Sequence, residues 1–373
     1  MPANLDIRRV ESPEATEIYI TATPGDNGPL QGLAEKVFSD IRDVLVSQNA
    51  QLLQERIFGT KSAMTEVLSV RSQVYVEIDD GIAPSALCGK DESAPLAGVQ
   101  VHAVISDTKP EAIVFDGTRC GRILRVPGRV YLTLSDIRAD EAAQKAGDPS
   151  EQAKVMLEKS ESVLKQFGAD FLSVPRTWMW LSDILSWYDD FNHVRNTIFT
   201  ERGLIGQGSR QSMPASTGIG LYPFDGSKCA MDLTALLEPA DSIQFLGAIG
   251  KQQCALEYGS AFSRASRSIT PAGETVFVSG TASIDASGAT TNVGDALGQI
   301  NTTIDNVRAV LRDMNAADED VVLVVAYCKT NEVEKVFNSL KSKYPWPWVT
   351  VICDICRPDL LFEIEATALP GKR

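Results

Sequence analysis

Two glutamates near the end of the chain have the type and spacing that suit acid–base chemistry. Glu363 and Glu365 lie in the apolar segment LLFEIEATAL (360–369). If this segment is a β-strand, both carboxylates share one face with Thr367, while Phe362 and Ile364 point to the other face. The acidic face is then either a solvated strand face or the wall of a cleft. Burial and a like charge two residues away both raise a carboxyl pKa, so in a cleft Glu363 is a candidate proton donor with Glu365 as its partner.

The neighbouring thiols are weaker candidates for chemistry. Cys353 and Cys356 form a CxxC motif, but a strand over 349–356 would point their sulfurs to opposite faces. The seven cysteines are odd in number and scattered through apolar runs, which is typical of free buried thiols in a cytosolic protein. We therefore predict no metal site and no redox role for this motif.

Composition excludes several further classes of function. The 373-residue chain carries a net charge of −14, which argues against nucleic acid or an anionic membrane as partner. It has no apolar run long enough to span a bilayer and no export signal, so we expect a cytoplasmic protein. With only His102 and His193, both expected to be packed or solvated, a His-rich metal site is not expected. The glycine clusters match no nucleotide-binding motif, and no cofactor is predicted.

An internal repeat organises the chain. From 274 onward the pattern is strand, helix (292–314), strand (320–330), helix (332–344), and two closing strands around Arg357-Pro358-Asp359. Residues 128–239 follow the same order, with a helix over 149–168, and in register Asp232 falls opposite Glu363. A looser copy opens the protein. We predict an α+β fold of tandem units, each a mixed sheet covered by helices on one face, divided as 1–115, 116–245 and 246–373.

Several segments resemble a known family. YGSAFSRA (258–265), VFVSGTASID (276–285) and FEIEATA (362–368) are similar to the reactive-intermediate deaminase (Rid) family, which has a chorismate mutase-like fold. Together with FNHVRNTIF, MPASTGIGLYPFDG and ICRPDLLFEIEA, they resemble the chorismatases, in which Rid-like units are joined in one polypeptide. The resemblance implies a pseudo-trimeric arrangement of units within one chain. Because Rid sites lie between subunits of a trimer, joined units would build a site internally, and we expect a monomer.

The resemblance implies removal of pyruvate from chorismate, with Glu363 protonating the enolpyruvyl ether and no cofactor taking part. One branch of the family hydrolyses chorismate to a dihydroxycyclohexadiene carboxylate, another forms 3-hydroxybenzoate, and a third forms both 3- and 4-hydroxybenzoate. Cys356, just before the turn, matches the hydroxybenzoate-forming pattern and favours 3-hydroxybenzoate. The enzyme is then a lyase-like or hydrolase-like chorismatase of secondary, shikimate-derived metabolism.

Chorismate is a dianion, so its two carboxylates require positive partners. Arg264 is the first candidate because Rid-like sites lie beside the motif that contains it. Arg176 and Lys329 follow, since they occupy matching strands of two copies, and Arg357 either contacts substrate or fixes the turn. For all but Arg264, a packing or surface role is an equal alternative.

Two further residues are candidates for substrate binding. Backbone N–H groups around Thr217 offer a cradle for a carboxylate, and Tyr222 offers a hydroxyl donor, each with an ordinary packing role as the alternative. Rid deaminases grip their substrate with an arginine early in the penultimate strand, but YPWPWVTV (344–351) has none. An imine deaminase is therefore a less favoured alternative, and a non-catalytic binding module is a third.

Overall fold

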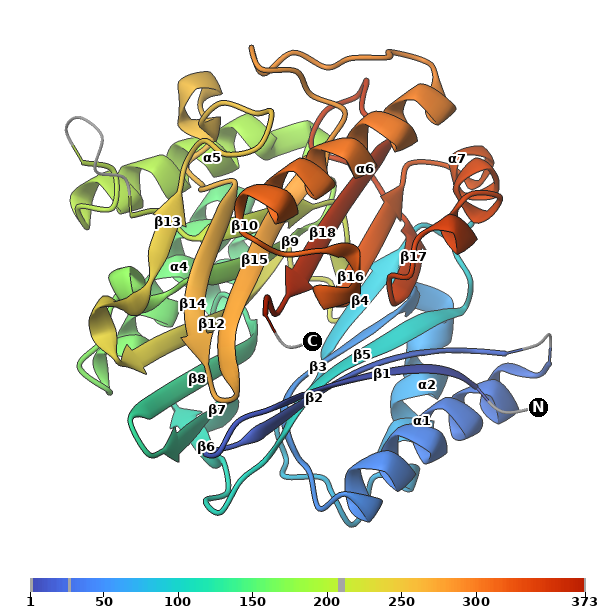
Figure 1. The fold of residues 1–373 in the computed structure, drawn as a ribbon, viewed down its shortest axis with the longest axis vertical. Coiled ribbons are helices and arrows are strands. Elements are labelled where there is room, and N and C mark those ends of the chain that lie inside the picture. Colours follow the sequence, from blue (N-terminus) through green and yellow to red (C-terminus); the bar gives the residue numbers. More distant parts are fainter. Residues whose placement is uncertain (1–2, 26–27, 207–211, 372–373) are drawn as a thin grey trace.

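The computed structural model describes residues 3–25, 28–206 and 212–371. Its strands form three six-stranded sheets, one for each stretch of the predicted repeat (Figure 1). Among the described residues, no helix is long and apolar enough to cross a membrane.

The first unit carries two helices on one sheet. Its elements are β1 (Asn4–Glu11), β2 (Thr16–Thr23), α1 (Leu30–Ser47), β3 (Gln51–Thr60), α2 (Lys61–Val74), β4 (Ser85–Gly89) and β5 (Leu96–Ile105). The sheet order is β1-β2-β5-β3-β4, with the short β11 (Tyr222–Pro223) added beside β4.

The second unit repeats this plan and adds the strand β6 and the short helix α3. Its elements are β6 (Glu111–Phe115), β7 (Thr118–Val126), β8 (Arg129–Ile137), α3 (Glu141–Ala146), α4 (Pro149–Lys165), β9 (Arg176–Leu181), α5 (Ile184–Glu201), β10 (Ala215–Ile219) and β12 (Cys229–Glu238). The sheet order is β10-β9-β12-β8-β7-β6.

The third unit contains the glutamate-bearing strand. Its elements are β13 (Gln244–Leu246), the 3-10 turn η3 (Ala255–Tyr258), β14 (Ala265–Thr270), β15 (Gly273–Ala282), α6 (Ala296–Asp313), β16 (Val321–Cys328), α7 (Asn331–Asn338), the 3-10 turn η5 (Lys341–Lys343), β17 (Trp348–Ile352) and β18 (Phe362–Ala368). The sheet order is β13-β14-β15-β18-β16-β17.

The three units share one topology. The closing strand of each unit lies between two strands and is antiparallel to both: β5 between β2 and β3, β12 between β8 and β9, and β18 between β15 and β16. Strands β4, β10 and β17 run parallel to β3, β9 and β16. Helices cover the outer face of each sheet, as the blue, green and orange-to-red helices of Figure 1 show. The predicted α+β fold of tandem units is therefore confirmed, including the first copy. Sheet membership changes between Ile105 and Glu111 and between Glu238 and Gln244, and the exact domain boundaries stay predictions.

Apolar side chains fill two kinds of core. Each unit has its own core between its sheet and helices. A further cluster joins all three sheets where their inner faces meet, and includes Phe58, Trp178, Phe277 and Tyr327. Because the inner faces are buried against one another, any polar group on them must find a partner there or line a cavity.

The apolar stripe of α6 packs as predicted, but the helix starts later. Ile300, Ile304 and Val307 are buried, whereas Val293 and Leu297 are 66% and 48% exposed. The helix begins at Ala296 because the carboxylate of Asp295 accepts a hydrogen bond from the backbone N–H of Gly298 and caps it. The predicted start at 292 was therefore wrong.

A buried polar cluster ties the units together. The Glu17 carboxylate of β2 bonds His102 Nε2 at 2.7 Å within its own unit, and accepts bonds from Thr270 Oγ1 and Ala272 N of the third unit, both at 2.7 Å. His102 stacks on Tyr19 with ring centroids 4.5 Å apart. Burial raises the pKa of Glu17, but these hydrogen bonds outweigh it and hold the pKa below its ordinary value.

Replacing Glu17 should therefore weaken the whole assembly. Glu17→Ala leaves buried donors from two units without an acceptor, and we expect the free energy of unfolding to fall by about 3 kcal/mol. Urea unfolding measures this. The exposed Glu66→Ala on α2 is the control, with an expected change within about 0.5 kcal/mol. Equal stability of the two variants would contradict the structural role of the cluster.

Candidate active site

Glu363 lies at the wall of a partly enclosed cavity between the second and third units. On β18 it pairs with Ala282 of β15 and with Tyr327 of β16, and it is 4% exposed. The cavity has a volume of about 120 Å³. Its lining residues come from α5, η3, the segment before β14, β15 and the turn before β18: Tyr188, Asp189, Asn192, Tyr258, Ser260, Phe262, Arg264, Gly280, Ala282, Ile284, Cys356, Arg357 and Glu363.

The environment of Glu363 favours its neutral form. Burial and, to a smaller extent, the nearby Glu365 carboxylate raise its pKa from 4.5 to about 8. The positive charges of Arg176, Arg264 and Arg357 act in the opposite direction but do not outweigh burial. Near neutral pH the side chain is therefore mostly a carboxylic acid, able to donate a proton into the cavity.

Glu365, two residues further along the same face, is held as an ion pair. Its Oε2 accepts a bond from Arg176 Nη2 at 2.8 Å, and its Oε1 accepts one from Trp178 Nε1 at 3.1 Å. Arg176 also donates to Thr217 Oγ1 at 2.6 Å. Burial lowers the pKa of Arg176 to about 10, which still leaves the guanidinium charged at neutral pH. Strand β18 thus carries two different acidic groups: among the described residues Glu363 has no ion-pair partner, whereas Glu365 is paired with Arg176.

Two arginines, Arg264 and Arg357, line the cavity and can bind an anion. Arg264, 1% exposed, donates from Nε to Gln253 O at 2.9 Å and from Nη2 to the hydroxyl of Tyr258. Arg357 donates from Nη1 to Gly288 O at 2.7 Å, and its guanidinium lies over the Tyr258 ring, 5.1 Å from the centroid. These contacts fix both side chains while leaving other guanidinium N–H groups for a ligand.

The end of β15 needs a glycine. A Cβ on Gly280 would lie 2.2 Å from Glu363 Oε1 and 3.3 Å from Thr217 Cγ2. Any side chain at this position would displace the carboxyl group, so the glycine sets how Glu363 sits against β15.

Helix α6 positions both flanks of the cavity through buried amides. Asn306 Nδ2 donates to Ala282 O at 3.0 Å and to Ile284 O at 3.2 Å. Gln299 donates from Nε2 to Asp359 O at 2.9 Å and accepts from Leu361 N at 2.8 Å, which holds the turn that carries Cys356 and Arg357. Buried side-chain amides of this kind rigidify the segments they bond.

The structure brings together four of the eight predicted site residues: Glu363, Arg264, Cys356 and Arg357. Burial raises the pKa of Cys356 to about 12, so it is a neutral thiol in the wall.

The other four predicted residues lie outside the cavity lining. Arg176 and Thr217 lie one layer beneath, bonded to each other and, through Arg176, to Glu365. Lys329 donates to Pro358 O, and the hydroxyl of Tyr222 donates to Asp183 Oδ1 at 3.0 Å. Nη2 of Arg176 carries both of these bonds, so the contact of this guanidinium is with Glu365 and Thr217 and it is not part of the cavity wall.

Sequence reasoning missed the contribution of α5. Tyr188 and Asn192 are four residues apart on one face of this helix and close the cavity from the second unit. Beneath them Arg195, 1% exposed, donates from Nη2 to Asn192 Oδ1 at 2.6 Å. The i, i+4 spacing of the two polar residues in WYDDFNHVRN was a usable signal, but nothing local indicated which unit this helix would face.

The predicted strand over 349–356 is too long. Strand β17 ends at Ile352, so Cys353 and Cys356 lie in the following turn rather than on alternating strand faces. Both cysteines are free thiols, as are the other five. Beyond Ile352, Cys353 N donates one more bond to Cys328 O of β16, and the chain then turns back into β18.

The raised pKa of Glu363 makes a testable contribution to stability. Its pKa is near 4.5 in the unfolded chain and about 8 in the folded protein, so between these values the unfolded state has lost a proton that the folded state keeps. Stability from this group is therefore lost as the pH rises through that range, at up to about 1.4 kcal/mol for each unit of pKa difference.

We expect Glu363→Gln to remove this loss. Urea unfolding at about pH 5 and about pH 8 should show the variant gaining stability relative to wild type at the higher pH. The exposed Glu66→Gln should follow wild type at both values. If the difference between Glu363→Gln and wild type were the same at both pH values, the side chain would not be a buried acid.

Comparisons with known proteins agree with this architecture. Residues 255–369 match the family model Endoribonuclease L-PSP. A crystal structure of a chorismatase superposes with a TM-score of 0.61, covering 99% of each chain at 18% identity. Yeast Mmf1 (TM-score 0.30, 16% identity) and a putative endoribonuclease from Thermotoga maritima (0.29, 21%) each cover 35% of this chain and 100% and 98% of their own. No curated protein sequence matches the chain significantly. The whole chain thus has the fold of a chorismatase, and its third unit carries the endoribonuclease L-PSP signature.

Proposed function

We propose that this protein removes pyruvate from chorismate, with Glu363 as the general acid. The observation that carries the proposal is a buried carboxyl group with a pKa raised to about 8, which lines a cavity together with Arg264 and Arg357. The shared fold with a chorismatase supports the choice of substrate.

The chemistry needs a proton donor at carbon. Glu363 transfers its proton to the methylene carbon of the enolpyruvyl ether, which produces an oxocarbenium ion and leaves a glutamate anion. Cleavage of the ring carbon–oxygen bond then sends its electron pair to the oxocarbenium group, which departs as the keto group of pyruvate. General acid catalysis of this kind contributes about 10²–10⁴ in rate. The developing positive charge is stabilised by the glutamate anion that the transfer creates.

We propose 3-hydroxybenzoate as the second product. In this route the ring's own hydroxyl oxygen forms a bond to the carbon that loses pyruvate, and its bond to the neighbouring ring carbon then breaks. The ring proton lost on aromatisation returns to the Glu363 carboxylate, so chorismate becomes pyruvate and hydroxybenzoate without water. Phe262, Ile284 and the neutral Cys356 form an apolar part of the wall, which supports this route because it offers no hydrogen bonds to an attacking water on that side. Hydrolysis, which adds one water and yields the dihydroxy acid, is the alternative outcome.

Binding requires the cavity to open. Its volume of about 120 Å³ is below the roughly 300 Å³ of a small ligand pocket. The half-buried rings of Tyr188 and Tyr258 would turn outward to admit the dianion. In this arrangement Arg264 and Arg357 face its two carboxylates, and Glu363 faces the ether.

The decisive variant is Glu363→Gln. It keeps the shape and the hydrogen-bonding capacity of the side chain but cannot donate a proton to carbon, so we expect pyruvate release to fall by about 10²–10⁴. A coupled pyruvate assay measures the rate, and chromatography identifies the aromatic product. Because the acid must be protonated, wild-type turnover should fall as the pH rises through about 8.

The exposed Glu332→Gln on α7 should keep wild-type turnover. Near-normal activity of Glu363→Gln would exclude it as the proton donor. Absence of pyruvate release by wild type would reject a chorismatase and leave a binding module. Ammonia release from an imine would instead support a deaminase.

A further inference from the structure

The shared topology creates three corresponding interfaces: β10 of the second unit faces β15 of the third, β17 of the third faces β2 and β5 of the first, and β4 of the first faces β8 of the second. The candidate active site occupies the interface where the third unit meets the second. At the interface of the second with the first unit, the residue corresponding to Glu363 is Asp232. It accepts bonds from Arg56 Nε at 2.7 Å and Ser85 Oγ at 2.6 Å and is 0% exposed, so this position is filled by an ion pair.

The remaining interface, between the first and third units, holds an open cavity of about 630 Å³. Its walls come from β2, β5 and α1 of the first unit and from α7, η5 and β17 of the third. The position corresponding to Glu363 is Gly98, which pairs with Phe58 as Glu363 pairs with Tyr327. A Cβ there would lie 3.0 Å from Val349 Cγ2, a tight contact, and this interface therefore has no acid at the position of Glu363.

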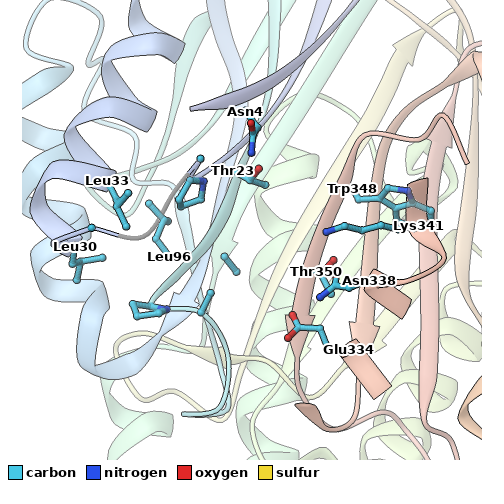
Figure 2. A pocket seen from close by; sticks show the side chains of 16 residues that line it. Asn4, Thr23, Leu30, Leu33, Leu96, Glu334, Asn338, Lys341, Trp348 and Thr350 are labelled. Carbon is cyan, nitrogen blue, oxygen red and sulfur yellow. The ribbon is translucent and has the colours of Figure 1, made fainter. Parts of the chain in front are cut away.

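The two walls of this cavity differ in chemistry. Figure 2 shows the side chains of Leu30, Leu33 and Leu96 on one wall and those of Glu334 and Lys341 reaching toward them from the other. Glu334 and Lys341 are both half-buried, yet among the described residues neither forms an ion pair with the other or with a third group.

Other polar groups point to a ligand on the same wall. The indole Nε1 of Trp348 is buried without a hydrogen-bond partner, although Trp348 lines the cavity. Asn338 lies one turn after Glu334 on α7 and faces the same space. A buried N–H that lacks a partner is unfavourable, and a bound acceptor would satisfy it.

We propose that this cavity binds a small zwitterion with an apolar side chain, an α-amino acid. A simple anion would be repelled by Glu334 and a simple cation by Lys341, whereas a molecule with both charges pairs with both residues. Its carboxylate accepts hydrogen bonds from the ammonium of Lys341, and its own ammonium donates to the carboxylate of Glu334. Its side chain contacts the wall formed by Leu30, Leu33 and Leu96. The volume accommodates residues as large as phenylalanine.

Calorimetric titration of the full chain tests this proposal with L-leucine and L-phenylalanine. 3-Phenylpropionate, which lacks the ammonium, and phenethylamine, which lacks the carboxylate, are the matched ligands. We expect saturable binding of at least one amino acid and about tenfold weaker binding of both single-charge analogues. Lys341→Met and Glu334→Gln should each weaken amino-acid binding by about tenfold.

Three control variants separate this site from its surroundings. The exposed neighbours Lys343→Met and Glu332→Gln, which do not line the cavity, should bind as wild type does. Glu363→Gln should also bind normally, because the candidate active site is a different cavity. The proposal is overturned if neither amino acid binds at millimolar concentration, if 3-phenylpropionate binds as tightly as phenylalanine, or if folded Lys341→Met and Glu334→Gln keep wild-type affinity.

Discussion

Burial of the Glu363 carboxyl group without a close counter-ion is the constraint on which the candidate site depends. Burying a carboxylate is energetically unfavourable unless it is paired with a positive group or a hydrogen-bond donor. Here Arg176 and Trp178 donate their hydrogen bonds to Glu365 and not to Glu363. The two acids share one strand face and one sequence motif, yet they have opposite roles. If Arg176 paired with Glu363 instead, the pKa of Glu363 would fall and the proton donor would become an anion. The buried charge of Glu365 would then have no counter-ion.

The three units show how one position can take three roles. Glu363 faces a cavity, Asp232 is locked by Arg56 and Ser85, and Gly98 carries no side chain. The same closing strand thus provides a candidate acid, an ion pair that joins two units, and the floor of a second cavity. Because each interface is built from two different units, the residues that complete a site lie far apart in the chain, as Tyr188 and Glu363 do.

The sequence predicted the repeat, the helices and the face of β18, since these depend on local periodicity. The stripe from Ile300 to Met314 and the alternation in FEIEATA were sufficient for this purpose. Contacts between units could not be predicted locally. Arg176 was a reasonable choice for an anion site because it matches Lys329 in the repeat, but only the packing of β9 against β18 assigns it to Glu365. Tyr188 and Asn192 were missed because the side of α5 that meets the third unit depends on the arrangement of whole sheets. The start of α6 was misplaced because Asp295, rather than the apolar period, determines where that helix begins.

The protonation state of Glu363 can be observed directly by infrared difference spectroscopy of wild type against Glu363→Gln. Subtracting the spectrum of the variant removes the signals of other buried acids. One of these is Asp136, because burial raises its pKa to about 7. The account predicts a carbonyl band of a protonated carboxyl group at neutral pH that disappears as the pH rises through about 8. A spectrum in which Glu363 is already a carboxylate at about pH 6 would contradict a general acid at this position.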